Sequence, residues 1–525
     1  MQNFEGGYGR AWLDNAVKRF EKLYENYEFE PGSGKKGVDV QVTSTINGTA
    51  GSQIATSASD NEHHIFFTED VFYYDVIRYN AGADITDIVT EQLSEYGETK
   101  SIEDKMDTSV KDFFNVDATA TPTYYALPHY FTYRTFYYDV DIFDRYGFWL
   151  LADGRFAGQK PGYNASKLGT TGWELSQGID GDNGHEFDGL PATYDEFFNM
   201  CEYMLSRGVI PMHTYGYGYP LNQTIYSAWA QNEGRESFLQ TFNPVGTSNR
   251  IIQSIDGNGT PTLFPENTMV DPYNVQAQLG KYQALQFAKR LAEGTESEPK
   301  YFHDFSFSPA ENNIQSQYTF IISAIIGKPI AMYADGIWWE NEATEAGTFA
   351  DSTYLGSLPK EERRYGVLPM PFAEESMIGN KWTINSNCNL SLSFINGNIK
   401  DQNILNTAKM FLRFLHTDEE LQNFSIQRSA LKPFKYTIPE NKMENMTYYG
   451  KQILSLTNNP NVDIVYTYSP YLGYMQDHTY YYPGEIGFGN TDVMRYFFRN
   501  TDKTVADLFW ELKAERNSAF KPPVL

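Results

Sequence analysis

The order of helical and strand patterns along the chain predicts an α/β fold. In LPATYDEFFNMCEYMLSRGVIPMHT, Thr193 and Glu196 match a capping box and Gly208 ends the helix. The apolar stripe of this helix has helical spacing and consists of Phe197, Cys201, Met204 and Leu205. A strand, VIPMHT, follows at once, and no period of roughly 20 to 50 residues recurs. We therefore expect helices packed on a sheet.

The N-terminal third contains one amphipathic helix and several short strands. RAWLDNAVKRFEKLYENY predicts a helix with one apolar face, formed by Trp12, Ala16, Phe20 and Leu23. VDVQV (38–42) and HHIFFT (63–68) are typical of strands because they are rich in β-branched or aromatic residues. The same alternation continues through YYALP, TFYYD and VDIFDRYGF, which also predict strands.

The rest of the chain alternates helices and strands with three long loops. Helical patterns occur in VQAQLGKYQALQFAKRLAEG, NTAKMFLRFLHTDEELQNF and TVADLFWELKAERN, and strand patterns in PIAMYAD and RYGVLPM. Residues 152–191, 254–272 and the tyrosine-dense 466–490 predict loops. Long loops in compact domains tend to carry function.

Composition excludes several classes of function. The 525 residues are 41% hydrophobic and 21% charged, and no apolar run is long enough to span a membrane. The 41 Lys and Arg against 67 Asp and Glu give 41 − 67 = −26, which repels nucleic acid and anionic lipid. Cys201 and Cys388 lack CxxC spacing, so neither a disulfide framework nor a zinc ribbon is predicted. Phosphate-loop, HExxH and GxSxG motifs are absent from the sequence.

The stretch DGIWWENEA places two adjacent indoles after a glycine turn. Aromatic residues make up 16% of the chain, and many lie beside Gly, Pro or Asn. A ring on such a loop can offer an apolar face to a hydrated ligand such as a sugar, whereas a ring in a helical stripe belongs to the core. Both interpretations remain open for this pair from composition alone.

The order of several blocks resembles the solute-binding proteins of ATP-binding-cassette (ABC) carbohydrate importers, of the maltose-binding type (family 1). These blocks are YALPHYFTYRTFYYDVDIFDRYGF, LPATYDEFF with GVIPM, GKPIAMYADGIWWENEA, YGVLPMPF and AKMFLRFLHTDEELQNFSIQRSALKPF. The resemblance implies a two-lobed periplasmic-binding-protein-like fold (type II), with discontinuous lobes joined by hinge strands. Lobe one would comprise 1–131 plus 372–433, and lobe two 132–371 plus 434–525.

The same resemblance implies a function. The protein is expected to bind an oligosaccharide between the lobes and deliver it to the permease subunits of an ABC transporter, as a monomer without catalysis or a required cofactor. Members of this family are extracellular lipoproteins on the cell surface or are periplasmic. The start, MQNFEGGYGR, does not match an export signal.

The resemblance also assigns binding residues at the carboxyl ends of strands. Trp338 matches the tryptophan that stacks on a pyranose, while Trp339 either joins it or anchors the helix in the core. Asp335 and Glu340 could accept hydrogen bonds from sugar hydroxyls, although acids near a helix start also act as caps.

Further candidates lie after other predicted strands and at the chain crossings. Phe67 lies near the end of the HHIFFT strand and Glu69 and Asp70 follow it, where the alternative is a helix capped by Thr68 with acids in its first turn. The remaining candidates are aromatic residues and one histidine: Tyr8, Tyr130, Phe131, Tyr133, His213, Tyr215, Tyr217 and Trp382. His213 could equally be a hydrogen-bonded structural residue.

A calcium site is a separate hypothesis. IDGDNGHEFDG places Asp180, Asp182, Glu186 and Asp188 on a glycine-containing loop, and oxygen donors at this spacing can surround Ca²⁺. The match to an EF-hand is imperfect, and a solvated acidic loop is the alternative. A bound ion would stiffen the loop without taking part in chemistry.

Two other functions remain open. A glycoside hydrolase needs two carboxylates about 5 to 9.5 Å apart. Asn341-Glu342 resembles a glycosidase acid/base motif, but no second acid in a matching context follows a strand. A carbohydrate-binding surface protein with no part in transport is the other alternative.

Overall fold

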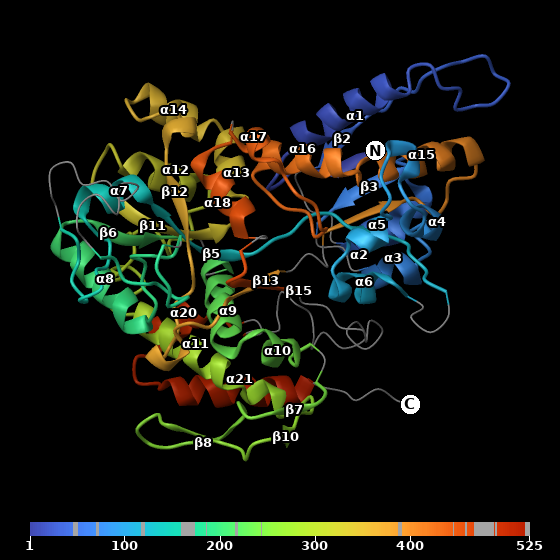
Figure 1. Cartoon of the computed structure of the whole chain (residues 1–525). Coiled ribbons are helices and arrows are strands. Elements are labelled where there is room, and N and C mark those ends of the chain that lie inside the picture. Colours follow the sequence, from blue (N-terminus) through green and yellow to red (C-terminus); the bar gives the residue numbers. More distant parts are fainter. Residues whose placement is uncertain are drawn as a thin grey trace. The chain divides into compact units, whose positions relative to one another are not determined.

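The computed structural model describes residues 1–45, 51–69, 73–116, 121–158, 174–184, 186–215, 219–242, 244–386, 391–444, 446–456, 459–466, 488 and 491–519. The chain folds into two compact units (Figure 1). Unit 1 comprises Met1–Thr132, Ser386–Met446 and the described residue Tyr466, and unit 2 comprises Tyr133–Asn385, Thr447–Val465 and the described residues from 488 onward.

Unit 1 is built on a mixed sheet. In spatial order its strands are β2 (Thr43–Thr45), β1 (Gln2–Phe4), β3 (Ile65–Thr68), β14 (Leu392–Ile395) and β4 (Leu127–Pro128). β1 pairs in parallel with β2 and β3, whereas β14 runs antiparallel to β3 and β4. β14 comes from the second stretch of unit 1, so this discontinuous unit is joined through its sheet.

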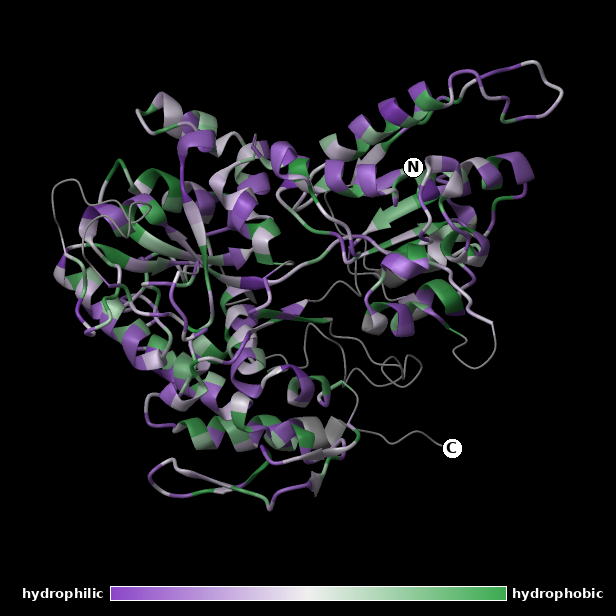
Figure 2. Cartoon of the chain, in the orientation of Figure 1, coloured by the Kyte–Doolittle hydropathy of each residue, from purple (hydrophilic) through white to green (hydrophobic). Residues whose placement is uncertain are grey.

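Helices surround this sheet. They are α1 (Ala11–Leu23), α2 (Gly51–Ser57), α3 (Tyr73–Arg78), α4 (Thr86–Thr90), α5 (Ile102–Lys105), α6 (Thr108–Phe114), α15 (Gln402–Phe414), α16 (Asp418–Arg428) and α17 (Glu440–Met443). The amphipathic pattern predicted for α1 is visible as alternating hydrophobic and hydrophilic segments (Figure 2). Trp12, Ala16 and Phe20 are buried as predicted, but Leu23 is exposed because the helix ends there.

Unit 2 has a four-stranded sheet with a separate apolar core on each face. The order is β12 (Tyr365–Leu368), β5 (Arg134–Asp139), β11 (Ile330–Gly336) and β6 (Ile210–His213). β11 is parallel to β6, and β5 is antiparallel to β11 and β12. Side chains alternate between the faces of a strand. Accordingly Phe136 contacts Phe197 and Phe287, whereas Tyr137 contacts Trp339 and Tyr449.

The helices of unit 2 are α7 (Val140–Tyr146), α8 (Tyr194–Ser206), α9 (Tyr219–Glu233), α10 (Arg235–Leu239), α11 (Leu279–Leu291), α12 (Asn313–Ser323), α13 (Trp339–Glu345), α14 (Thr348–Tyr354), α18 (Tyr448–Leu456), α20 (Val493–Arg499) and α21 (Val505–Ala519). α9 packs on β5 and β11, α11 packs on α9, and α18 packs on β12. Three small ladders complete the unit: β13 (Trp382–Ser386) with β15 (Val462–Tyr466), β7 (Thr247–Ser248) with β10 (Thr268–Met269), and β8 (Ile252–Ile255) with β9 (Pro261–Leu263).

Several predicted elements are wrong. The predicted strand 38–42 is not a strand, and β2 begins only at Thr43. VDIFDRYGF forms helix α7 because the Asp139 carboxylate accepts a hydrogen bond from the Ile142 N–H at 3.0 Å and caps the helix. The predicted helix NTAKMFLRFLHTDEELQNF is two helices, α15 and α16, because Thr417 caps a new start. The predicted loop 254–272 contains the β8–β9 hairpin and β10.

The units differ from the predicted lobes by more than one described residue at two boundaries. Residues 372–385 belong to unit 2, because the Phe372 N–H donates to the Ala192 carbonyl at 2.8 Å and the Thr383 N–H donates to Gln231 at 2.7 Å. Residues 434–446 belong to unit 1, where the Lys435 N–H donates to the Lys105 carbonyl at 2.6 Å.

No helix of the described ranges combines the length and the apolar character needed to cross a membrane.

Candidate functional site

The carboxyl edge of the unit 2 sheet gathers the main candidate residues. The parallel strands β6 and β11 both end at this edge, and the antiparallel β5 begins there, with Arg134 opposite Gly336 in the register. Tyr215 follows β6 and is partly exposed. Open α/β sheets bind ligands at this edge, so the location agrees with the sequence prediction.

Trp338 is the partly exposed indole at this edge. It occupies the N-cap position of α13, and its ring folds back over Gly336. A Cβ atom at Gly336 would lie 2.3 to 2.4 Å from atoms of the ring, so only glycine leaves room for this indole. The Arg134 guanidinium carbon lies over the same ring, 4.7 Å from its centroid.

Trp339 is a core residue. Its indole is fully buried, with ring centroids 4.9 Å from Tyr365 and 5.5 Å from Tyr449. The prediction that it faces a ligand is therefore wrong, and the alternative of a helix anchored in the core is correct. Consecutive residues in the first turn of a helix point in different directions, which separates the two indoles.

Asp335 is buried beneath this turn. Its Oδ1 accepts a hydrogen bond from the Gly336 N–H at 2.7 Å, and its Oδ2 accepts one from the Gln317 amide at 3.3 Å. The Gln317 amide also donates to Glu342 at 2.8 Å. Burial, and then the nearby Glu342 charge, raise the pKa of Asp335 well above its usual range. Asp335 thus fixes the turn instead of capping α13 or reaching solvent.

Glu340 is also structural. Burial raises its pKa to about 7, and the Thr447 hydroxyl donates to its carboxylate at 3.0 Å. The Tyr449 hydroxyl donates to the Ile337 carbonyl at 2.8 Å. These contacts attach the start of α18 to the Trp338 turn, so the expectation of Glu340 as an exposed sugar acceptor is wrong.

His213 is a structural residue at the end of β6. Its ring is buried, with Nδ1 2.8 Å from the Ser306 hydroxyl and Nε2 3.4 Å from the Glu311 carboxylate. Burial lowers the pKa of this histidine below its usual value. Tyr217, predicted beside it, lies outside the described residues.

In unit 1 the predicted aromatic residues form a buried cluster. Phe67 and Tyr130 are inaccessible, and Phe67 packs edge-on against Trp12 at 5.4 Å. Tyr8 lies 4.7 Å from the Tyr130 ring, and its hydroxyl donates to the carbonyl of the buried Phe131 at 3.3 Å. The expectation that these rings line a ligand surface is therefore wrong.

A buried lysine completes the cluster in unit 1. The Lys432 ammonium lies 5.2 Å from the Trp12 ring, 4.8 Å from the Phe424 ring and 3.3 Å from Nδ1 of His129. Burial lowers the pKa of Lys432 to about 7. Lys432 was not among the site residues predicted from the sequence.

The turn after β3 is only partly described. The Thr68 hydroxyl donates to the Leu392 carbonyl of β14 at 3.1 Å, and the residues that it would cap lie outside the described ones. Glu69 is partly exposed, whereas Asp70 lies outside the described residues.

Tyr133 and Trp382 are buried in unit 2. Their ring centroids are 6.2 Å apart, and Phe187 packs against Trp382 at 5.9 Å. Neither ring is available to a ligand, contrary to prediction.

The four acids of the calcium hypothesis bind separate partners. Asp180 accepts from the Asn461 amide at 2.9 Å, and Asp188 accepts from the Gly184 N–H at 2.7 Å. Glu186 accepts from Ser455 and Asn459, while the exposed Asp182 accepts from the Asn183 N–H at 2.8 Å. Across the described ranges no group of three or more His, Cys, Asp or Glu side chains could hold a metal ion. The residues therefore do not form the cluster that this hypothesis requires.

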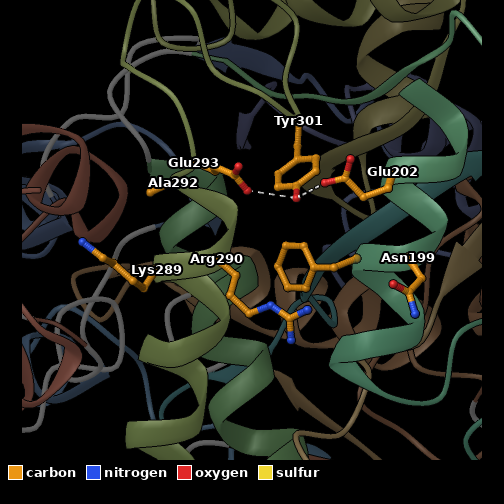
Figure 3. A pocket seen from close by; sticks show the side chains of 8 residues that line it. Asn199, Glu202, Lys289, Arg290, Ala292, Glu293 and Tyr301 are labelled. Carbon is orange, nitrogen blue, oxygen red and sulfur yellow. Dashed lines mark hydrogen bonds between the residues drawn. The ribbon is translucent and has the colours of Figure 1, made fainter. Parts of the chain in front are cut away.

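A surface hollow of about 390 Å³ between α8 and α11 is a different feature (Figure 3). The Tyr301 hydroxyl lies 2.6 Å from Glu202 and 3.2 Å from Glu293, and Lys300 bridges both carboxylates. Arg290 covers the Phe198 ring at 4.1 Å and pairs with Asp195. These pairs join α8 to Glu293, just after α11, and to residues 300–301, so the hollow is a structural contact between helices.

Arg134 and Gln317 are site residues that sequence analysis missed. Arg134 immediately precedes the predicted strand TFYYD, and a strand antiparallel to β11 brings its first residue to the carboxyl edge. The sequence predicted the strand that follows Arg134, but it did not predict that this strand, β5, pairs with β11.

Solved structures of sugar-binding proteins share this fold. SBP RafE in complex with raffinose superposes with a TM-score of 0.53 at 12% identity, covering 99% of each chain. A chitin oligosaccharide binding protein gives 0.52 at 13% identity, covering 97% of this chain and 94% of that one. BlMnBP2 from Bifidobacterium animalis subsp. lactis, a manno-oligosaccharide specific solute binding protein solved with mannotriose, gives 0.52 at 13% identity over 99% and 94% of the chains.

No family model and no curated protein matches the sequence. At these identities the structural likeness establishes the fold, and the predicted two-lobed α/β solute-binding-protein fold is confirmed.

Proposed function

We propose that the protein binds an oligosaccharide at the carboxyl edge of the unit 2 sheet, with the Trp338 indole as the stacking surface. The observation that carries the proposal is the partly exposed indole after β11, in a fold shared with oligosaccharide-binding proteins. An indole face packs well against the apolar face of a pyranose, while the polar edge of the sugar stays hydrated or hydrogen-bonded.

The surroundings of Trp338 support such a role. Gly336 leaves room for the Trp338 ring, and the buried Asp335 stabilises the turn by accepting a hydrogen bond from the Gly336 N–H. A surface that is already ordered loses little conformational entropy when a ligand binds. Tyr215 lies partly exposed at the end of β6, at the same edge of the sheet.

Delivery of the sugar to ABC permease subunits is part of the same proposal, as is a location outside the cytoplasmic membrane on a lipid-anchored chain or in a periplasm. The support for these roles is the shared fold. The net charge of −26 is consistent with a small neutral ligand in place of a polyanion.

The experiment is isothermal titration calorimetry with raffinose, mannotriose and chitotriose. We expect one of these neutral oligosaccharides to bind the wild type, and Trp338→Ala to weaken binding by about 30-fold or more if the indole is the central contact. Trp510→Ala is the matched control, because Trp510 is a partly exposed tryptophan of α21 with Lys513 over its ring. Equal affinity of wild type and Trp338→Ala would refute the site.

A hydrolase is the second candidate, because the raised pKa of Asp335 beside Glu342 resembles an acid pair. Asp335 is fully buried and engaged by Gly336 and Gln317, which argues against contact with a substrate. Incubation with the bound oligosaccharide, followed by an assay for new reducing ends, separates the candidates. Binding without release of reducing ends supports the receptor.

A calcium role remains a proposal without structural support. Melting in the presence and absence of chelator tests it directly: an unchanged midpoint would remove it.

A further inference from the structure

The planar guanidinium of Arg134 already lies over the Trp338 ring. The Arg134 guanidinium carbon is 4.7 Å from the ring centroid, and Arg134 is partly exposed. Gly336 also packs against the indole, so closely that an added Cβ atom would lie 2.3 to 2.4 Å from ring atoms. A pyranose that stacks on this indole must therefore take the place of the guanidinium or share the ring with it.

Arginine is suited to this position. A guanidinium is planar and weakly hydrated, and it stacks on aromatic rings more readily than an ammonium does. The backbone of Arg134 is held independently of its side chain, because its carbonyl accepts a hydrogen bond from Ser227 at 2.7 Å and β5 pairs with β11. These backbone hydrogen bonds do not involve the side chain, so they remain in place when the guanidinium leaves the ring.

We infer that Arg134 is a specificity-determining residue that covers the Trp338 indole and is displaced when a neutral oligosaccharide stacks there. The inference rests on the proposed function in one respect, namely that the ligand stacks on Trp338. The guanidinium shields the indole from water in the free protein, and every stacking ligand must compete with it. Weakly stacking solutes are thereby disfavoured.

The cover itself is tested without a ligand. Acrylamide quenching is measured for wild type and for Arg134→Ala, each with and without Trp338→Phe, so that the difference isolates the Trp338 emission from the other tryptophans. We expect the Trp338 component to be quenched more strongly in Arg134→Ala than in the wild type. Equal quenching of this component would overturn the inference.

Binding then tests the competition. Calorimetry with the neutral oligosaccharide that binds the wild type should show about two- to five-fold tighter binding by Arg134→Ala, which corresponds to the lower end of the range for cation–π contacts. Arg134→Lys should lie between the two, because an ammonium stacks less well. Weaker binding by Arg134→Ala would overturn the inference, since it would mean that the guanidinium holds the sugar directly.

The two proposals can fail separately. If none of the oligosaccharides binds the wild type but Arg134→Ala increases quenching of Trp338, the sugar-binding proposal fails and the cover stands. If an oligosaccharide binds through Trp338 but Arg134→Ala changes neither quenching nor affinity, the cover fails alone. Unfolding curves of Arg134→Ala and Arg134→Met, which keeps the apolar stem, distinguish loss of the cover from loss of folding.

Discussion

Trp338 and Trp339 are neighbours in the chain but lie in different environments. Trp338 is partly exposed, whereas Trp339 packs among Tyr137, Tyr365 and Tyr449 without solvent contact. Trp339→Ala should lower the free energy of unfolding by about 3 to 5 kcal/mol, because it removes a full indole from a packed core. Trp338→Ala should lower it much less. Urea unfolding measures both, and comparable losses would contradict the assignment of the two rings.

Asp335 predicts a pH dependence of stability. Burial raises its folded pKa, while the unfolded residue releases its proton at about pH 4. Between these pH values the folded state binds more protons, so this contribution is complete below about pH 4 and is lost as pH rises through the folded pKa. Its neighbours are the Glu342 carboxylate, the Gln317 amide and the Tyr333 hydroxyl.

Asp335→Asn should reduce this loss, because an amide keeps the Gly336 hydrogen bond and does not ionise. We expect the decrease in stability from pH 5 to pH 8 to be smaller by about 1 kcal/mol or more than in the wild type. Urea unfolding at both pH values is the measurement. Glu340→Gln is the parallel variant, since Glu340 has a pKa of about 7 and titrates in the same range. Identical slopes for wild type and Asp335→Asn would rule out Asp335 as the source.

The buried Lys432 should make stability increase with pH, which is opposite to the effect of Asp335, and in a higher pH range. The unfolded chain holds this proton up to about pH 10, whereas the folded lysine has a pKa of about 7. Between these values the unfolded state binds more protons, so wild-type stability rises with pH. Lys432→Met keeps a side chain of similar length against Trp12 and Phe424 without the buried charge.

We expect Lys432→Met to be more stable than the wild type by about 1 to 3 kcal/mol at pH 7, and the gain to shrink towards pH 10. Chemical unfolding at pH 7 and pH 9.5 is the measurement. A loss of stability that is the same at both pH values would show that the lysine contributes through packing instead.

At the level of elements, local signals in the sequence predict the structure best. Both hydrogen bonds of the α8 capping box, between Thr193 and Glu196, are present as predicted, because they depend only on residues three apart. The same chemistry was available for α7, where Asp139 caps the start and Gly147 ends the helix with φ of 68°. The alternation of apolar and polar residues in VDIFDRYGF instead led to the prediction of a strand.

The candidate site was predictable only in part, for a physical reason. Trp338 lies at the end of a strand, and that position is readable from the chain order. Which aromatic residues are exposed depends on packing between distant segments, as with Tyr8 against Tyr130. The position of Arg134 over Trp338 depends on the β5–β11 register, which joins residues about two hundred positions apart and has no local signal.

The turn between β11 and α13 can be tested by one methyl group. Gly336→Ala places a Cβ where the Trp338 ring now lies, so the indole must shift while the backbone angles stay allowed. We expect sugar affinity to fall about tenfold, with a smaller loss of stability than for Trp339→Ala, since the strained group is partly exposed. Gly257→Ala, in the β8–β9 turn, is the control because its Cβ would meet no neighbouring atom. Unchanged affinity in Gly336→Ala would show that binding does not depend on the position of the Trp338 ring.

The chain divides into two compact units, and a ligand can stabilise one compact unit more than the other. A ligand that binds only unit 2 stabilises unit 2, whereas a ligand that contacts both units in the bound state stabilises both. At a ligand concentration of about 100 times Kd the stabilisation amounts to about 2.7 kcal/mol. The amount gained by each unit therefore reports which units the sugar contacts.

Hydrogen exchange resolves the two units. With a saturating oligosaccharide we expect slower exchange of amides in β11 of unit 2, and the sequence-based expectation of a ligand bound between two lobes adds slower exchange in β3 of unit 1. Trp338→Ala, at the same ligand concentration, should lose the protection in both strands. Protection confined to β11 would mean that the sugar binds unit 2 alone, which favours a carbohydrate-binding surface protein over a transport receptor that closes on its ligand.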